Sequence, residues 1–341
     1  MDTTPQQSGP VIRTSGLTRT FTRGKHTVEA VRGLDLEVHD GELVAFLGPN
    51  GAGKSTTLRM LTTLIPPTSG TARVAGFDVV RDQRAVRRSI GYVGQGNAAG
   101  HQQRGRDEIV SQARAHGLSR SEAHRRAEEL LDAFDLTEHA DRPVSTLSGG
   151  QRRRLDVAIG LVHQPRLMFL DEPSTGLDPQ NRVNLQEQVQ RLNRDLGTTI
   201  LLTTHYLEEA DAIADRVVII DHGLVIADDT AARLKSGLGD LVSLAFATRE
   251  DAVLAAEQAG RLDGAAVAVD GTRVTVRVPH GRDLAPGLVT ALAAAGSPAS
   301  SIEVVSATLD DVFLHLTGRS LRESTQTTGD ALPETTEGDA A

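Results

Sequence analysis

The apolar and polar positions alternate in a way that predicts strands and helices in turn over the first two thirds of the chain. From Val11 to about Gly223, short β-branched runs are separated by segments with helical spacing. Four apolar runs are too short for helices and are typical of parallel strands covered on both faces. They lie at residues 42–47, 167–170, 199–203 and 216–220. This alternation predicts an α/β fold.

A helical segment interrupts this pattern between about residues 105 and 140. Residues 119–134 are rich in charge and carry apolar side chains at helical spacing. The apolar positions are Ala123, Ala127, Leu130, Leu131 and Phe134. Such spacing places them on one face of a helix, so we expect a helical subdomain, which we bound at about residues 96–165.

The pattern changes again after about Leu238. Helical segments at 251–259 and 284–295 lie among strand-like runs, and a last helix is expected near 309–316. The strand-like runs are 241–247, 265–269, 273–278 and 302–305. We therefore expect a small α+β domain at 238–318, after a first domain at 11–237. Residues 1–10 and 319–341 are polar and are expected to be disordered.

Composition narrows the function. The chain has no cysteine, which excludes disulfide scaffolds, thiolate zinc sites and cysteine catalysis. A net charge of −9 argues against non-specific nucleic-acid binding, which needs an excess of Lys and Arg. No apolar run approaches the roughly 18 residues that span a bilayer, and the first ten residues lack the features of a secretory signal. We therefore expect a cytoplasmic protein.

A phosphate-binding loop is the first chemical motif. It reads Gly48-Pro49-Asn50-Gly51-Ala52-Gly53-Lys54-Ser55 and matches G-x-x-x-x-G-K-[ST] in full, between a predicted strand and a predicted helix at 55–64. Glycines let backbone N–H groups converge on phosphate oxygens, and the positive end of the helix adds to this cradle. Lys54 is expected to reach the β- and γ-phosphates, and the Ser55 hydroxyl to bind Mg²⁺.

A pair of carboxylates ends the predicted strand Leu167-Met168-Phe169-Leu170. Strand ends are where α/β sheets place ligand chemistry. Asp171 suits a Mg²⁺ site, and Glu172 suits a general base or water-positioning role in attack on the γ-phosphate. A strand that ends in Asp-Glu is a weak signal alone, but beside a phosphate loop it indicates nucleotide hydrolysis.

Leu147-Ser148-Gly149-Gly150-Gln151 opens another predicted helix at 151–161. Ser148 can cap that helix and also donate to a phosphate, while the two glycines expose backbone N–H groups. A second anion site so far along the chain has no obvious role toward the same nucleotide within one subunit.

These motifs, with Ser174-Thr175-Gly176-Leu177-Asp178, resemble the nucleotide-binding domain of ABC ATPases over about residues 11–235. The resemblance implies a phosphate-loop NTPase core that binds ATP and Mg²⁺. It also implies a head-to-tail dimer of two copies, in which LSGGQ of one subunit closes ATP on the phosphate loop of the other. Nucleotide contacts are then expected from Phe21, which would stack on adenine, from Gly48 to Ser55 and Thr56, from Ser148, Gly149, Gly150 and Gln151 of the mate, and from Asp178 across the dimer.

The same resemblance assigns two further residues. Gln95 matches the residue that links Mg²⁺ and the nucleophilic water to the membrane partner, so the expected metal ligands are Ser55, Gln95 and Asp171. His205 matches the histidine that contacts the γ-phosphate at a strand end. With Glu172, Gln95 and His205 form the expected catalytic set.

The end of the chain indicates which ABC ATPase this is. Residues 307–319, ATLDDVFLHLTGR, resemble the end of the daunorubicin-resistance type. That resemblance implies the ATPase subunit of a drug exporter, on the cytoplasmic face of the cell membrane, bound to a separate permease of the ABC-2 class. The polar loop at 96–108 departs from the acidic and apolar stretch usual in the family at the position where the permease docks.

Two other hypotheses stay open at this point. One is a soluble ABC protein that acts on ribosomes or DNA, although this chain has one set of motifs and no long insertion or cysteine between the phosphate loop and LSGGQ. The other is an ABC ATPase for a substrate that is not a drug. The C-terminal segment disfavours an importer.

Overall fold

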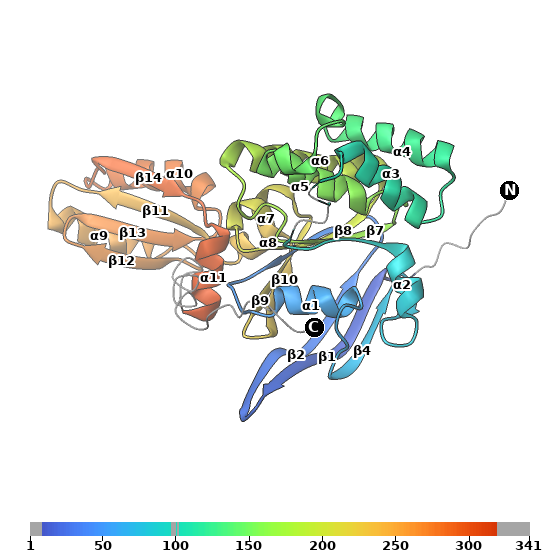
Figure 1. Ribbon diagram of the computed structural model, residues 1–341. Coiled ribbons are helices and arrows are strands. Elements are labelled where there is room, and N and C mark those ends of the chain that lie inside the picture. Colours follow the sequence, from blue (N-terminus) through green and yellow to red (C-terminus); the bar gives the residue numbers. More distant parts are fainter. Residues whose placement is uncertain (1–8, 97–99, 101, 319–341) are drawn as a thin grey trace. The chain divides into compact units, whose positions relative to one another are not determined.

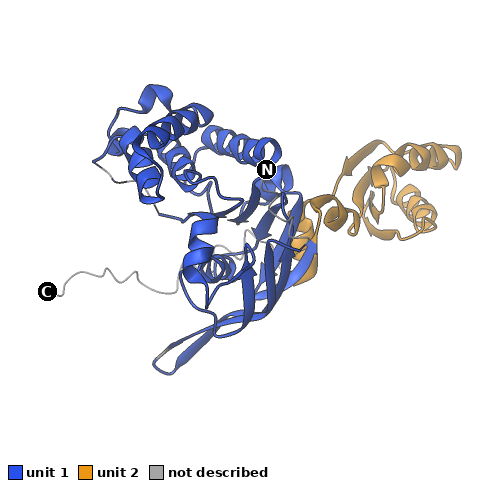
Figure 2. Cartoon of the chain, turned by 90° about the vertical axis from the view of Figure 1, so that its right-hand side faces the viewer, with its two compact units in different colours: residues 1–228, 324–341 blue, residues 229–323 orange. Residues whose placement is uncertain are grey.

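The computed structural model describes residues 9–96, 100 and 102–318 of the chain. It divides into two compact units with the boundary after Asp228, and Figure 2 distinguishes them by colour. Each unit has its own hydrophobic core.

A six-stranded sheet forms the centre of the first unit, in the order β10-β9-β3-β8-β7-β6. The pairs among β9, β3, β8, β7 and β6 are parallel, and β3, β7 and β8 are buried along their whole length. This confirms the interpretation of short apolar runs as central strands. The strands are β3 (Leu43–Leu47), β6 (Ile90–Val93), β7 (Leu167–Asp171), β8 (Thr199–Thr204), β9 (Arg216–Asp221) and β10 (Leu224–Asp229).

A second, antiparallel sheet packs into the same core, in the order β2-β1-β4-β5. Its strands are β1 (Ile12–Arg23), β2 (His26–Val38), β4 (Ser69–Val74) and β5 (Phe77–Asp78). The sequence pattern did not predict this sheet as such. Buried and exposed residues alternate along the second half of β2, so one face packs on the core while the other stays polar.

Four helices connect the strands of the first unit. They are α1 (Lys54–Leu61), α2 (Gln83–Ser89), α6 (Pro179–Leu196) and α7 (Leu207–Ile213). The longest, α6, begins after Asp178, whose carboxylate accepts a hydrogen bond from Asn181 N, and has Pro179 in its first turn. It ends at Gly197 in a left-handed conformation, an ordinary helix stop.

A helical subdomain lies between β6 and β7 along the chain, as the sequence predicted. It consists of α3 (Gly105–Ala115), α4 (Arg120–Ala133) and α5 (Gly149–Gly160), with short 3₁₀ turns η1 (Thr137–His139) and η2 (Val144–Thr146). Figure 1 shows the three helices side by side in green. Ser119 and Glu122 close a capping box at the start of α4, and the apolar stripe predicted there is buried.

The second unit is a small α+β domain with the element order βαββαβ. Its sheet is antiparallel in the order β12-β13-β11-β14, as in ferredoxin-like folds. Its elements are α8 (Ala231–Ser236), β11 (Asp240–Ala245), α9 (Arg249–Ala259), β12 (Ala266–Asp270), β13 (Arg273–Val278), α10 (Gly281–Ala294), β14 (Ser301–Val305) and α11 (Leu309–Thr317). The four predicted strands and the last helix are confirmed.

The unit boundary lies earlier than the expected one after residue 237, because α8 packs on α11 and so belongs to the second unit.

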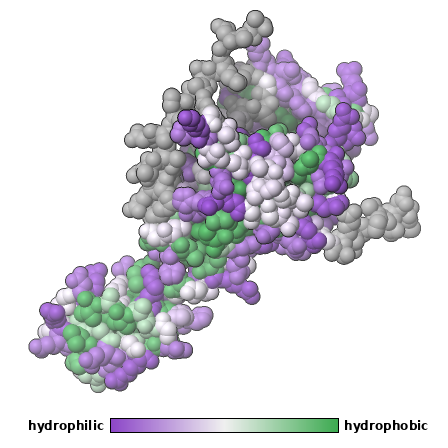
Figure 3. All heavy atoms as spheres, turned by 90° about the horizontal axis from the view of Figure 1, so that it is seen from below, coloured by the Kyte–Doolittle hydropathy of each residue, from purple (hydrophilic) through white to green (hydrophobic). Residues whose placement is uncertain are grey.

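Figure 3 shows apolar surface on the second unit, and its exposed apolar side chains include Val269, Ile302 and Val305. Most of the two end segments expected to be disordered, namely residues 1–8 and 319–341, lies outside the described residues.

Candidate nucleotide-binding site

The phosphate loop lies between the end of β3 and the start of α1, where the sequence predicted it. It borders a cavity of about 480 Å³ lined by Val28, Ala30, Asn50, Gly51, Gly53, Lys54, Ser55, Thr56, Gln95 and Glu172. Two glycines are required by close backbone approach. A Cβ at Gly48 would lie 2.1 Å from the Ile220 carbonyl oxygen, and one at Gly53, whose φ is 105°, would lie 2.3 Å from that of Ala30.

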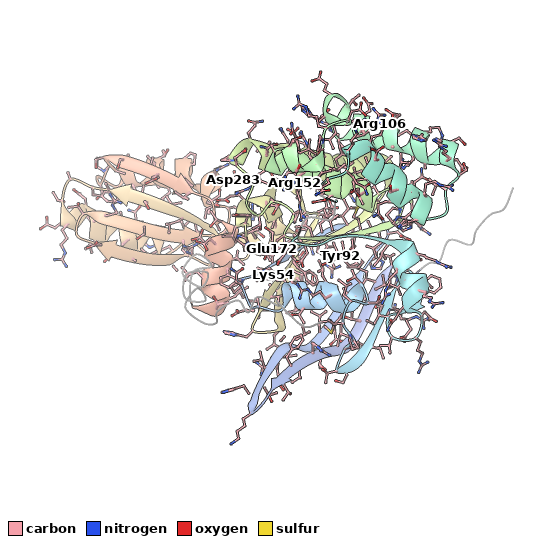
Figure 4. All side chains as sticks on the ribbon, in the orientation of Figure 1. Lys54, Tyr92, Arg106, Arg152, Glu172 and Asp283 are labelled. Atoms are coloured by element: carbon pink, nitrogen blue, oxygen red, sulfur yellow. The ribbon has the colours of Figure 1, made fainter. Side chains whose placement is uncertain are left out.

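Lys54 is almost completely buried at the start of α1. Its Nζ donates hydrogen bonds to the carbonyls of Gly48 (2.7 Å) and Pro49 (3.0 Å) and lies 3.6 Å from Glu172 Oε1, and Figure 4 shows the two side chains next to each other. Burial lowers the pKa of Lys54, and the carboxylates of Glu172 and Asp171 oppose that shift. The loop therefore holds a cation at its centre whose partners are backbone carbonyls and one carboxylate.

Asp171 ends β7 with a buried carboxylate. Its Oδ1 accepts hydrogen bonds from Ser55 Oγ (2.8 Å) and Thr203 Oγ1 (2.7 Å), and Gln95 Nε2 donates to the same Ser55 oxygen at 3.3 Å. Within the described part of the chain, Asp171 Oδ2 is buried and has no hydrogen-bond partner. The structure thus brings together the three residues expected as metal ligands, and leaves one carboxylate oxygen free to accept a further ligand.

Glu172 follows in an unusual backbone conformation. Its φ is 46°, in the left-handed region, and its N–H donates to Thr203 Oγ1 at 2.9 Å. Oε2 accepts a hydrogen bond from the Thr175 hydroxyl (3.3 Å) and lies 3.5 Å from His205 Nδ1. Burial raises the pKa of Glu172, but the close contact with His205 and the charge of Lys54 outweigh it, so the pKa lies below its usual value. A carboxylate with a low pKa is ionised at neutral pH.

The LSGGQ residues, Leu147 to Gln151, form what we call the signature segment, and they lie away from this cavity. Ser148 caps α5 in a capping box with Gln151, and Ser148 and Gly149 are exposed. Gly150 is buried, and a Cβ there would lie 2.3 Å from Oδ1 of Asn181, which bonds Asp178 at the start of α6. None of these residues lines the phosphate-loop cavity in the described chain.

Phe21 is not among the residues that line the cavity either. It lies on β1 opposite Val28, which does line the cavity, and Phe21 is 41% exposed. The Arg19 guanidinium covers the ring at 4.5 Å from its centroid. Phe21 is therefore adjacent to a cavity-lining residue by strand pairing, and its stacking role stays a prediction.

Sequence reasoning missed several residues of the site. Thr203 bonds both Asp171 and the Glu172 backbone, and Val28 and Ala30 line the cavity from β2. Thr203 precedes Thr204 and His205, so its place at the end of a predicted strand was a usable signal. Val28 and Ala30 gave none, because β2 comes from the sheet that the sequence did not predict.

Comparison with known proteins agrees with this geometry. The ABC transporter family matches residues 31–175. The daunorubicin/doxorubicin resistance ATP-binding protein DrrA of Streptomyces peucetius is 44% identical over 93% of this chain and 94% of its own length. The doxorubicin resistance ATP-binding protein DrrA of Mycobacterium tuberculosis is 41% identical over 89% and 92%. This chain belongs to the daunorubicin-resistance type of ABC transporter ATP-binding proteins.

Solved structures extend the likeness to the fold. A dimeric post-hydrolysis state of the ATP-binding cassette MJ0796, bound to ADP and phosphate, has a TM-score of 0.60 and 25% identity, covering 64% of this chain and 98% of that one. The cbiO1 protein of Clostridium perfringens has the same TM-score with 27% identity, covering 65% of this chain and 89% of that one.

As a member of the family named above, the chain binds and hydrolyses ATP. Among its described helices, none is long and apolar enough to cross a bilayer.

Proposed function

We propose that this chain hydrolyses ATP to power the efflux of a drug or another hydrophobic compound through a separate permease of the ABC-2 class. The observation that carries the proposal is the similarity to drug-resistance ATP-binding proteins over nearly the whole chain, including the second unit. A linearmycin resistance ATP-binding protein of Bacillus subtilis, 34% identical over 88% of this chain, favours the same class of substrate. In this proposal the chain binds the permease at the cytoplasmic face of the membrane.

The chemistry centres on Glu172. An ionised carboxylate beside the phosphate loop suits a general base that positions and deprotonates the attacking water. Lys54 and the backbone N–H groups from Gly48 to Thr56 would hold the phosphates. His205, in contact with the Glu172 carboxylate, would donate to the γ-phosphate and keep Glu172 oriented.

Mg²⁺ suits the residues next to Glu172. The free oxygen of Asp171 and the hydroxyl of Ser55 are the hard oxygen ligands that this ion prefers, and Gln95 can supply an amide oxygen. When bound there together with ATP, the ion would neutralise charge on the phosphate oxygens.

The exposed position of Ser148 and Gly149 supports a composite site. Because these residues lie away from the phosphate loop of their own chain, they are free to contact ATP held by a second copy. Asp178 and Phe21 would contact the mate and the adenine respectively.

Deletion and complementation in the source organism test the export function. Loss of the gene should raise the intracellular accumulation of an anthracycline such as daunorubicin, since efflux loses its energy source. Expression of the wild-type chain should reverse the accumulation, whereas Glu172→Gln at equal expression should not. Unchanged accumulation after deletion, for daunorubicin, doxorubicin and linearmycin, would contradict export of the drugs that its relatives are named for while leaving the ATPase assignment intact.

A further inference from the structure

Arg153 is a buried arginine on α5, the helix that begins at the signature segment. Its side chain is 8% exposed, and the guanidinium donates three hydrogen bonds to backbone carbonyls. Nε donates to Pro173 O (2.8 Å), Nη2 to Asp171 O (3.1 Å) and Nη1 to Gly94 O (2.7 Å). Burial lowers the pKa of Arg153, while nearby carboxylates oppose the shift. A buried charge is costly, so each of these bonds has to be well formed.

Two of the three carbonyls lie on either side of Glu172. The left-handed φ of Glu172 is unfavourable for a residue with a side chain, and a residue before proline normally prefers an extended backbone. A strained conformation of this kind persists only where its surroundings fix it. Two contacts supply that constraint. The Arg153 guanidinium holds the carbonyls of Asp171 and Pro173, and Thr203 Oγ1 accepts the hydrogen bond from the Glu172 N–H.

The third carbonyl belongs to Gly94, the residue before Gln95. The strands β6 and β7 are paired in parallel, with Val93 opposite Leu170, so the two strand ends are neighbours. A single guanidinium therefore joins α5 to the segment that carries Gln95 and to the segment that carries Glu172. Lysine cannot replace it, because an ammonium group lacks the planar fork that reaches three separate acceptors.

We infer that Arg153 is a positioning residue for ATP hydrolysis: it fixes the backbone on both sides of Glu172 and before Gln95, and so sets where the carboxylate meets the attacking water. The inference rests on the proposed role of Glu172 as the base. Arg153 does not line the phosphate-loop cavity, so its effect passes through the residues that it holds.

Steady-state kinetics of Arg153→Lys in the full chain test this role. We expect kcat to fall by about 10-fold or more, because a small misplacement of a catalytic group strongly lowers the rate of the chemical step. KM for ATP and the affinity for a non-hydrolysable ATP analogue should change by less than about 3-fold, because the phosphate loop is untouched. Arg153→Gln, which removes the charge and keeps an amide donor, is measured in the same way if the lysine variant is not folded.

Arg126→Lys is the matched control. Arg126 on α4 is also mostly buried and donates to a backbone carbonyl, that of Leu161 just after α5, but it holds neither Glu172 nor Gln95. It should lose a similar amount of thermal stability and keep its kcat. An unchanged kcat in a folded Arg153 variant, or equal losses of kcat in both variants, would overturn the inference.

Glu172→Gln distinguishes this failure from a failure of the proposed function. If Glu172→Gln still hydrolyses ATP, the base assignment itself is wrong. If Glu172→Gln is inactive and folded Arg153→Lys is fully active, Glu172 keeps its role and only the positioning by Arg153 is excluded.

Discussion

At the scale of single residues, the site depends on how Glu172 is held. Its carboxylate lies between Lys54 on one side and His205 and Thr175 on the other, and its N–H bonds Thr203. Because the charge of Lys54, the contact with His205 and the Thr175 hydroxyl stabilise the ionised form, the carboxylate stays charged over the neutral range. This arrangement suits a base more than an acid.

Replacement of Glu172 by glutamine tests that arrangement. The variant should bind ATP as the wild type does and lose hydrolysis by about 100-fold or more, since only the proposed water-activating group is changed. Phosphate release and nucleotide titration measure the two effects separately. Glu187→Gln, on an exposed part of α6, should leave both unchanged. Near wild-type turnover in Glu172→Gln would exclude the base role.

A second glutamate, Glu209 on α7, is buried, and its pKa is shifted in the opposite direction. Burial raises its pKa, and the hydroxyls of Thr204 and Ser174 oppose the shift, with Ser174 Oγ donating to Oε2 at 2.9 Å. The folded state therefore keeps a proton that the unfolded state releases. The stability that Glu209 contributes is complete below the unfolded pKa and is lost as the pH rises through the folded pKa.

Glu209→Gln should remove that loss, because an amide does not titrate. The Tm of Glu209→Gln relative to that of the wild type should therefore be higher at about pH 8 than at about pH 5. Thermal unfolding at both values measures it. A difference that is the same at both pH values would show that the pKa of Glu209 is not raised.

At the scale of elements, the phosphate loop requires close contact between β3 and β9. Gly48 follows β3, and a Cβ there would lie 2.1 Å from the Ile220 carbonyl oxygen. Backbone cannot move aside as a flexible side chain can, so Gly48→Ala should destabilise the first unit by about 1–3 kcal/mol or more. Thermal unfolding of Gly48→Ala measures this loss. Gly149→Ala is the control, because its added Cβ meets nothing within 4 Å and its φ is not positive. Equal Tm values for the two variants would contradict the close-packing argument.

The elements also show which strands a sequence pattern reveals. The runs that became β3, β7 and β8 are buried on both faces, so nearly every residue in them is apolar and the pattern is plain. In β1 and β2 one face is polar and the register shifts several times, which breaks the period of two. For this reason the antiparallel sheet, and with it Val28 and Ala30, was missed.

At the scale of the whole molecule, the proposed composite site predicts that two copies associate only around ATP. Ser148 lies outside the cavity of its own chain. Ser148→Arg should therefore keep ATP binding in the monomer and abolish both dimer formation and hydrolysis, because the larger side chain blocks the contact with the mate's nucleotide.

Size-exclusion chromatography in the Glu172→Gln background measures this dimer, since slow hydrolysis preserves bound ATP. Glu172→Gln alone should elute at about twice the monomer mass when ATP is present. Combined with Ser148→Arg, it should elute as a monomer. A loss of ATP binding in the Ser148→Arg monomer, or a persistent dimer in the combined variant, would contradict a site shared between copies.

The sequence by itself determined the phosphate loop, the Asp171–Glu172 pair, the signature segment and the α/β class. These features are local: a backbone cradle, a strand end and a helix start are each encoded within a few neighbouring residues. The second unit followed in the same way, from strands with one polar face and helices with clear periods.

Only the tertiary structure decided how these parts act on one another. Arg153 looked like any charged residue of a polar helix, yet folding buries it and joins it to the carbonyls of Gly94, Asp171 and Pro173. Backbone carbonyls carry no side-chain identity, so no sequence pattern marks them as partners. The left-handed conformation of Glu172 is equally invisible in the sequence, because it depends on contacts between segments that are far apart along the chain.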